Sequence, residues 1–147
     1  MSHNLGVNSS SNDFATLDST LNALYDLISG PAGEKRDWER YRSLFAPGAR
    51  LMPVVHGSGD KPHVRLLSID DYIQRVEPIF TLENFWERET SRKTEVFGSV
   101  AHVLSAYESL RNQNGEPFDR GANSIQLFND GSRWWVVSIM WNTSRGE

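Results

Sequence analysis

The fold is decided by residues 97–141, which read FGSVAHVLSAYESLRNQNGEPFDRGANSIQLFNDGSRWWVVSIMW. Three segments of this stretch, at 99–110, 120–128 and 133–141, have the composition and spacing of β-strands. The dipeptide Asp130-Gly131 joins the last two segments, and Asp-Gly between such runs is a strong signal for a β-hairpin. The last third of the chain is therefore predicted to be an antiparallel sheet without helices.

Helical patterns precede this sheet. In three segments, apolar residues recur every three or four positions, as on one face of an amphipathic helix. We expect helices at 13–28, 34–45 and 68–80, with Asp13 and Ser68 as N-caps and a kink or an end near Pro78. Two further strands are expected, at 49–55 and 85–97. Because most strands follow the helices, the order favours an α+β fold in which a curved sheet forms a pocket.

The composition limits the class of protein. A chain of 147 residues with 38% hydrophobic content fits one globular domain, which we place at 13–147. Residues 1–12 are polar and lack the pattern of a secretory signal, so we expect a disordered tail. No apolar run approaches the ~20 residues of a membrane span, and a net charge of −4 without a basic patch disfavours nucleic-acid binding. We therefore expect a cytoplasmic protein that binds neither membranes nor nucleic acid.

Four stretches carry a resemblance to a known family: 37–50, 68–72, 95–103 with 107–108, and 120–127 with 133–135. They resemble the NTF2-like, SnoaL-like domains, whose fold is a cone-shaped α+β barrel. The third and fourth stretches resemble an uncharacterised bacterial subgroup of that family. The resemblance covers residues 14–142 and implies a curved antiparallel sheet packed on three N-terminal helices, with a homodimer formed through the sheet. It leaves the function open, because such domains include ketosteroid isomerases, scytalone dehydratases, polyketide cyclases, transport factors and binding domains.

Acid–base chemistry has one leading candidate, His102, because histidine titrates near neutral pH. If His102 faces the cavity, it is a general base; the alternative is a partly buried histidine tied to a neighbouring strand. Tyr107, Arg120 and Asn123 are the candidate donors that polarise a ligand carbonyl. Glu108 has the same strand parity as His102 and would orient it; for Glu108 and Arg120 the alternative is a cross-strand ion pair. Glu87 and Glu89 are interpreted instead as members of cross-strand ion pairs on a solvated face.

Candidate ligand-binding residues are aromatic or polar side chains in otherwise apolar segments. They are Trp38, Tyr41, Glu108, Asn123, Gln126 and Trp141. Buried amides need hydrogen-bond partners, so Asn123 and Gln126 either contact a ligand or connect the strands of the sheet. For Tyr41 and Tyr107 the alternative is core packing with a satisfied hydroxyl.

No metal site or cofactor is predicted. The four histidines have no metal-ligand spacing, the chain has no cysteine, and no glycine motif for phosphate is present. Two hypotheses remain. The first is an enzyme that isomerises, dehydrates or cyclises a small hydrophobic carbonyl compound. The second is a homodimeric module without catalysis that binds a small ligand or a protein partner. The strand 133–141 is apolar on both faces, which favours a sheet whose second face is covered by another subunit.

Overall fold

The computed structural model describes residues 12–57, 59 and 61–144. The predicted tail, apart from Asn12, lies outside these described residues. The helices are α2 (Leu17–Asp26), α3 (Trp38–Arg42) and α4 (Ile69–Leu82). The strands are β1 (Phe45–Val55), β2 (His63–Val64), β3 (Trp86–Phe97), β4 (Val100–Leu110), β5 (Asp119–Asn129) and β6 (Trp134–Thr143).

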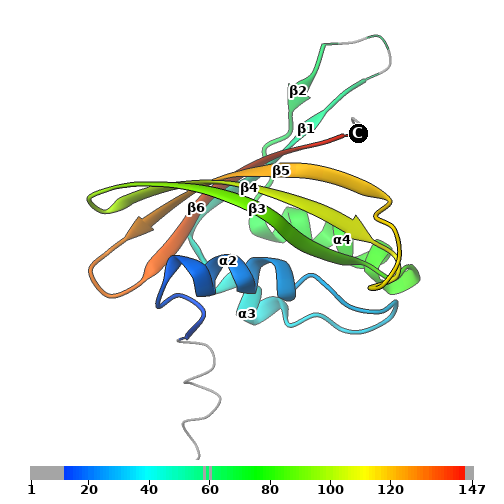
Figure 1. The fold of residues 1–147 in the computed structure, drawn as a ribbon, viewed down its shortest axis with the longest axis horizontal. Helices are drawn as coiled ribbons and strands as arrows, with labels where there is room; N and C mark the ends of the chain where they lie inside the picture. The colour runs from blue at the N-terminus through cyan, green and yellow to red at the C-terminus, as the bar shows by residue number, and fades with distance from the viewer. Residues whose placement is uncertain (1–11, 58, 60, 145–147) are drawn as a thin grey trace, which may run out of the picture.

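A curved six-stranded sheet forms one layer, and the helices lie against one of its faces (Figure 1). The strand order is β2-β1-β6-β5-β4-β3, and β3 to β6 form the predicted antiparallel meander. The β5–β6 hairpin turns at Asp130-Gly131, where Gly131 has a φ of 100° that disfavours other residues. The sheet as a whole is mixed, because β1 pairs in parallel with β6. The predicted α+β class is confirmed.

The helix N-termini follow local hydrogen bonding. Ser68 caps α4 as predicted, in a capping box with Asp71. The prediction that Asp13 caps the first helix was wrong, because Thr16 does so together with Ser19. Asp13 instead accepts two hydrogen bonds from Arg40, with an Nε–Oδ2 distance of 2.7 Å. It thereby joins the start of the chain to α3.

The second predicted helix is much shorter than expected. It spans only Trp38–Arg42, because the chain enters β1 already at Phe45. Pro47-Gly48, residue types that often follow the end of a helix, lies within β1 at an irregular register with β6, and Gly48 has a φ of 80°. Pro78 does not end α4, which continues past it to Leu82. Phe80, in the last turn of this helix, is buried in the core.

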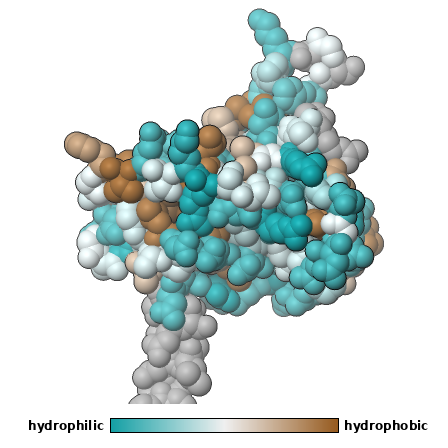
Figure 2. All heavy atoms as spheres, viewed as in Figure 1, coloured by the Kyte–Doolittle hydropathy of each residue, from teal (hydrophilic) through white to brown (hydrophobic). Residues whose placement is uncertain are grey.

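The two faces of the sheet have different environments. On β4, the odd-numbered positions from Ala101 to Ser109 are buried under the helices, and the even-numbered positions form the outer face. The outer face carries exposed apolar side chains, which include Phe97, Val100 and Leu104. Figure 2 shows hydrophobic residues gathered at the end of the molecule where the β3–β4 hairpin lies. Within the described part of the chain, no helix is long and apolar enough to cross a membrane.

Candidate functional site

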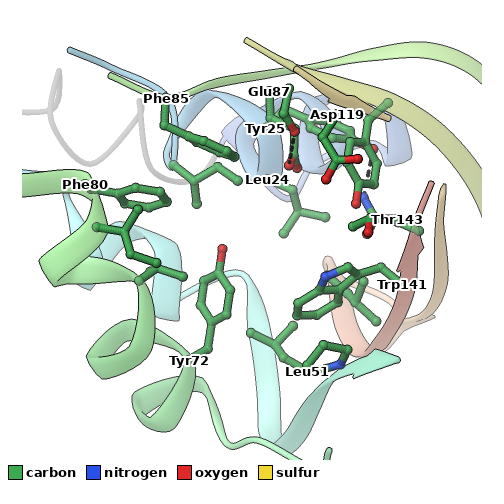
Figure 3. Close-up of a pocket in the computed structure, with 18 of the residues that line it drawn as sticks. Leu24, Tyr25, Leu51, Tyr72, Phe80, Phe85, Glu87, Asp119, Trp141 and Thr143 are labelled. Carbon is green, nitrogen blue, oxygen red and sulfur yellow. Dashed lines mark hydrogen bonds between the residues drawn. The ribbon is translucent and has the colours of Figure 1, made fainter. Parts of the chain in front are cut away.

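A cavity of about 280 Å³ lies between the inner face of the sheet and the helices. Its walls are mainly aliphatic and aromatic, and they include Leu24, Leu51, Tyr72, Phe80, Phe85 and Trp141. Figure 3 shows Glu87 and Asp119 at one end of the cavity and Tyr72 and Leu51 at the other. The cavity therefore has a polar end and an apolar end.

The polar end follows from the register of three strands. Glu87 on β3 pairs with Ser109 on β4, and Ser109 pairs with Asp119 on β5. Paired residues on one face of a sheet bring their side chains together. All three residues line the cavity, and Ser109 Oγ donates to Glu87 Oε2 at 3.3 Å. Two carboxyl groups distant in sequence thus line the same end of one cavity.

The cavity strongly perturbs Glu87. Some of the residue is exposed to solvent, but its carboxyl group lies inside the cavity (Figure 3). Burial raises the pKa of this carboxyl to about 8, because the charged form loses its hydration. The nearby charge of Asp119 raises the pKa further, while the hydrogen bond from Ser109 lowers it. A carboxyl with such a pKa exchanges protons near neutral pH.

Three cavity tyrosines keep their protons at neutral pH. Burial raises the pKa of Tyr25 to about 12, and it also raises the pKa values of Tyr41 and Tyr72. The charge of Glu87 adds to all three shifts, which places these hydroxyls within electrostatic reach of the carboxyl. The hydroxyl of Tyr72 points into the cavity (Figure 3). The phenols are therefore hydrogen-bond donors rather than bases.

One buried hydroxyl at the cavity has no protein partner. Thr143 Oγ1 is the single buried side-chain oxygen or nitrogen without a hydrogen bond among the residues that the structure describes. Thr143 lines the cavity (Figure 3). A buried polar atom without a partner is costly, so a bound polar atom at this position would stabilise it.

Four of the predicted site residues line the cavity. They are Tyr41, Tyr107, Asn123 and Trp141. Tyr107 lies over Gly121, where a Cβ atom would come within about 2.5 Å of the tyrosine hydroxyl. Asn123 Nδ2 donates to the hydroxyl of Tyr25 at 3.0 Å. Trp141 contacts Tyr72 edge to face, with 6.0 Å between ring centroids.

His102 does not reach the cavity. It lies on the outer face of β4, where its side chain is 39% exposed and Nε2 is 3.0 Å from Ser124 Oγ. The general-base role predicted for a ligand in the cavity is therefore wrong, because the sheet separates the imidazole from it. Glu108 lies on this face, as its strand parity predicts, but its Oε1 lies 2.8 Å from Arg88 Nη2 in a cross-strand ion pair instead of orienting His102.

Three more predicted residues lie outside the cavity lining. Arg120 and Gln126 are exposed on the outer face of β5, because their even numbers place them opposite Asn123. Trp38 is buried on α3, where Nε1 donates to Glu77 at 3.3 Å and the ring stacks on Phe80. These positions do not support contact with a ligand in the cavity.

Sequence reasoning missed Glu87, Asp119 and Thr143. Glu87 was assigned to a solvated face because charged residues dominate β3. The sequence contains one indication of this site. Glu87 and Glu89 lie on the same face of their strand, and the next strand carries Ser105 and Ser109, which donate hydrogen bonds to these carboxyl groups. The described residues contain no group of three or more His, Asp or Glu side chains that could hold a metal ion.

Comparisons with known proteins show the fold. No family model matches the sequence, and no curated protein matches it. A protein of unknown function with a cystatin-like fold from Nostoc punctiforme is 10% identical, with a TM-score of 0.64 over 88% of this chain and 93% of the other. A scytalone dehydratase-like protein from Novosphingobium aromaticivorans is 12% identical, with a TM-score of 0.63 over 98% and 89%.

An NTF2-like protein of unknown function from Methylobacillus flagellatus is 16% identical, with a TM-score of 0.56 over 95% and 93% of the two chains. The chain therefore has the NTF2-like fold, as predicted. At these identities the likeness extends to the fold and leaves the chemistry to the residues of the cavity.

Proposed function

We propose that the cavity binds a small, largely apolar molecule with a carbonyl group and that Glu87 transfers protons on it. The observation that carries this proposal is the placement of the Glu87 carboxyl inside a cavity with aromatic walls. Such an environment suits a general acid or base that works near neutral pH. The reaction class is isomerisation, dehydration or cyclisation.

The proposed step begins with ionised Glu87. Its carboxylate removes a proton from the carbon next to the ligand carbonyl, and the electron pair moves to the carbonyl oxygen. An N–H of Asn123 or the hydroxyl of Tyr72 donates a hydrogen bond to this oxygen. Glu87 then returns the proton to the same carbon or, where a β,γ double bond makes the intermediate a dienolate, to its γ carbon. Tyr107 lines the same cavity and remains a candidate donor.

Proton exchange on simple ketones tests the proposal without knowledge of the natural substrate. Cyclohexanone and 2-tetralone would be incubated with the protein in D₂O between pH 6 and 9, and deuterium incorporation followed by NMR. We expect wild-type protein to exceed the buffer rate, with a rate that rises with pH through about 8 as Glu87 ionises.

Glu87→Gln is the decisive variant, since glutamine keeps the shape but cannot accept the proton. Glu108→Gln is the matched control, because Glu108 lies on the outer face. Exchange lost in the first variant and kept in the second would support the proposal. Exchange at the buffer rate in wild type, or equal rates in Glu87→Gln and wild type, would refute it.

The second candidate is a non-catalytic homodimeric module. The exposed apolar residues of the outer sheet face favour this role, because exposed apolar patches often mark interaction sites. They include Val100, Leu104, Phe128 and Met140. A second copy of the chain is the proposed partner, and the cytoplasm remains the proposed location.

Sedimentation velocity tests this second candidate. Leu104→Asp places a charge in the outer face and is expected to leave a monomer if a dimer forms there. Leu82→Asp is the matched control, because Leu82 is an exposed leucine at the end of α4 on the helical side. A monomeric wild type, or a dimer unaffected by Leu104→Asp, would contradict dimerisation through this face.

A further inference from the structure

A network of hydrogen bonds runs from the cavity along the inner face of the sheet, by way of Tyr25 on α2, to an ion pair. Asn123 Nδ2 lies 3.0 Å from the Tyr25 hydroxyl, which lies 2.6 Å from Ser105 Oγ. Ser105 Oγ lies 2.6 Å from Glu89 Oε2. Arg92 completes the network by pairing with both carboxylate oxygens of Glu89, at 2.7 Å to Oε1 and 3.0 Å to Oε2.

The ion pair between Glu89 and Arg92 determines which atom donates and which accepts in each hydrogen bond of this network. Glu89, paired with Arg92, only accepts hydrogen bonds, so Ser105 donates its proton to Glu89. Ser105 must then accept from Tyr25, and the Tyr25 oxygen must accept from Asn123. Tyr25 keeps the proton that it donates, because its pKa is about 12.

This direction decides the orientation of the Asn123 side chain. The nitrogen and oxygen of an amide have nearly the same shape, and the hydrogen-bond network determines which lies where. Here the oxygen of Tyr25 requires the nitrogen, so Oδ1 and the second N–H remain for the cavity that Asn123 lines. The single proton of Tyr25 is directed to Ser105, which makes Tyr25 unsuitable as a donor to a ligand.

We propose that Tyr25, Ser105 and Glu89 are positioning residues that hold the Asn123 amide in one orientation, so that its second N–H recognises the carbonyl oxygen of the ligand. The part that concerns the ligand rests on the proposed function. The orientation of the Asn123 amide is inferred from the geometry of the hydrogen-bond network alone.

Two serines on β4 provide a matched pair of variants. Ser105 and Ser109 are both buried on the inner face, but Ser109 bonds to Glu87 and lies outside the network. The side-chain amide signals of Asn123, assigned by their loss in Asn123→Leu, would be recorded by ¹H–¹⁵N NMR without ligand. We expect Ser105→Ala to move both N–H signals and Ser109→Ala to leave them in place.

Tyr25→Phe and Tyr72→Phe form a second pair, which keeps the test decisive if Ser105→Ala does not fold. Tyr25→Phe removes a member of the network and should move the Asn123 signals, whereas Tyr72→Phe should not. Unmoved signals in Tyr25→Phe or Ser105→Ala would overturn the positioning role.

Ketone exchange separates the two parts of the proposal. In Ser105→Ala we expect kcat/KM to fall by about tenfold to a hundredfold, with the pH midpoint of the rate unchanged. Wild-type exchange with full activity in Ser105→Ala would overturn recognition by Asn123. If the NMR signals move as expected but wild type exchanges no ketone, the positioning network is supported and the proposed function, together with the recognition role, fails.

Discussion

Replacing Glu87 by glutamine is expected to stabilise the protein at alkaline pH. The pKa of this carboxyl is about 8 in the folded chain, against an ordinary value of 4.5. The difference of about 3.5, at 1.36 kcal/mol for each pKa unit, corresponds to about 5 kcal/mol. Between the two values the folded state holds a proton that the unfolded state has released. The stability of wild type therefore falls as pH rises from 4.5 to about 8.

Glutamine stays neutral and can still accept the hydrogen bond from Ser109, so the variant lacks this pH dependence. Urea unfolding of both proteins at pH 6 and pH 9 measures the effect, and comparing them removes the contributions of other titrating groups. By pH 6 the free energy of unfolding of wild type has fallen by about 2 kcal/mol, and by pH 9 it has fallen by the full amount of about 5 kcal/mol. The variant should gain about 3 kcal/mol on wild type between these pH values. An equal difference at both pH values would refute the reasoning.

Three further predictions follow from the site. Gly121→Ala should lower the free energy of unfolding by about 1–3 kcal/mol or more, because its Cβ would meet the Tyr107 hydroxyl at 2.5 Å, whereas Gly115→Ala, with 3.3 Å to its nearest atom, should cost less in the same urea titration. Ser109→Ala should move the pH midpoint of ketone exchange upward, since the lost hydrogen bond lowers the pKa of Glu87; a downward shift would contradict this. His102→Ala should leave ligand-induced thermal shifts unchanged, because the residue lies across the sheet from the cavity; a lost shift would mean that the two faces are coupled.

Local patterns were sufficient for most elements of the fold. The Asp130-Gly131 hairpin and the Ser68 capping box depend on residues a few positions apart, and both are present as predicted. The predicted boundaries of the second helix were wrong. Phe45 pairs with β6, more than 80 residues away, and this pairing outweighs the helical spacing of the residues before it. Such non-local pairing leaves no local signal in the sequence.

The candidate site was predicted only in part, for a related reason. Asn123 and Trp141 were identified because a polar amide in an apolar strand and a large aromatic residue are conspicuous by themselves. Glu87 was assigned to solvent because its neighbours along the chain are charged. Its actual neighbours, Ser109 and Asp119, lie beside it through the register of three strands.

The sequence by itself determined the class of the fold and the alternation of faces along each strand, because both depend on the spacing of apolar residues. Only the tertiary structure decided which alternate face of residues 97–141 lies under the helices. That choice directs Ser105, Asn123 and Trp141 toward the interior and His102 and Gln126 away from it. A period of two residues specifies two faces but not which face is covered, and the covering helices are brought there by long-range packing.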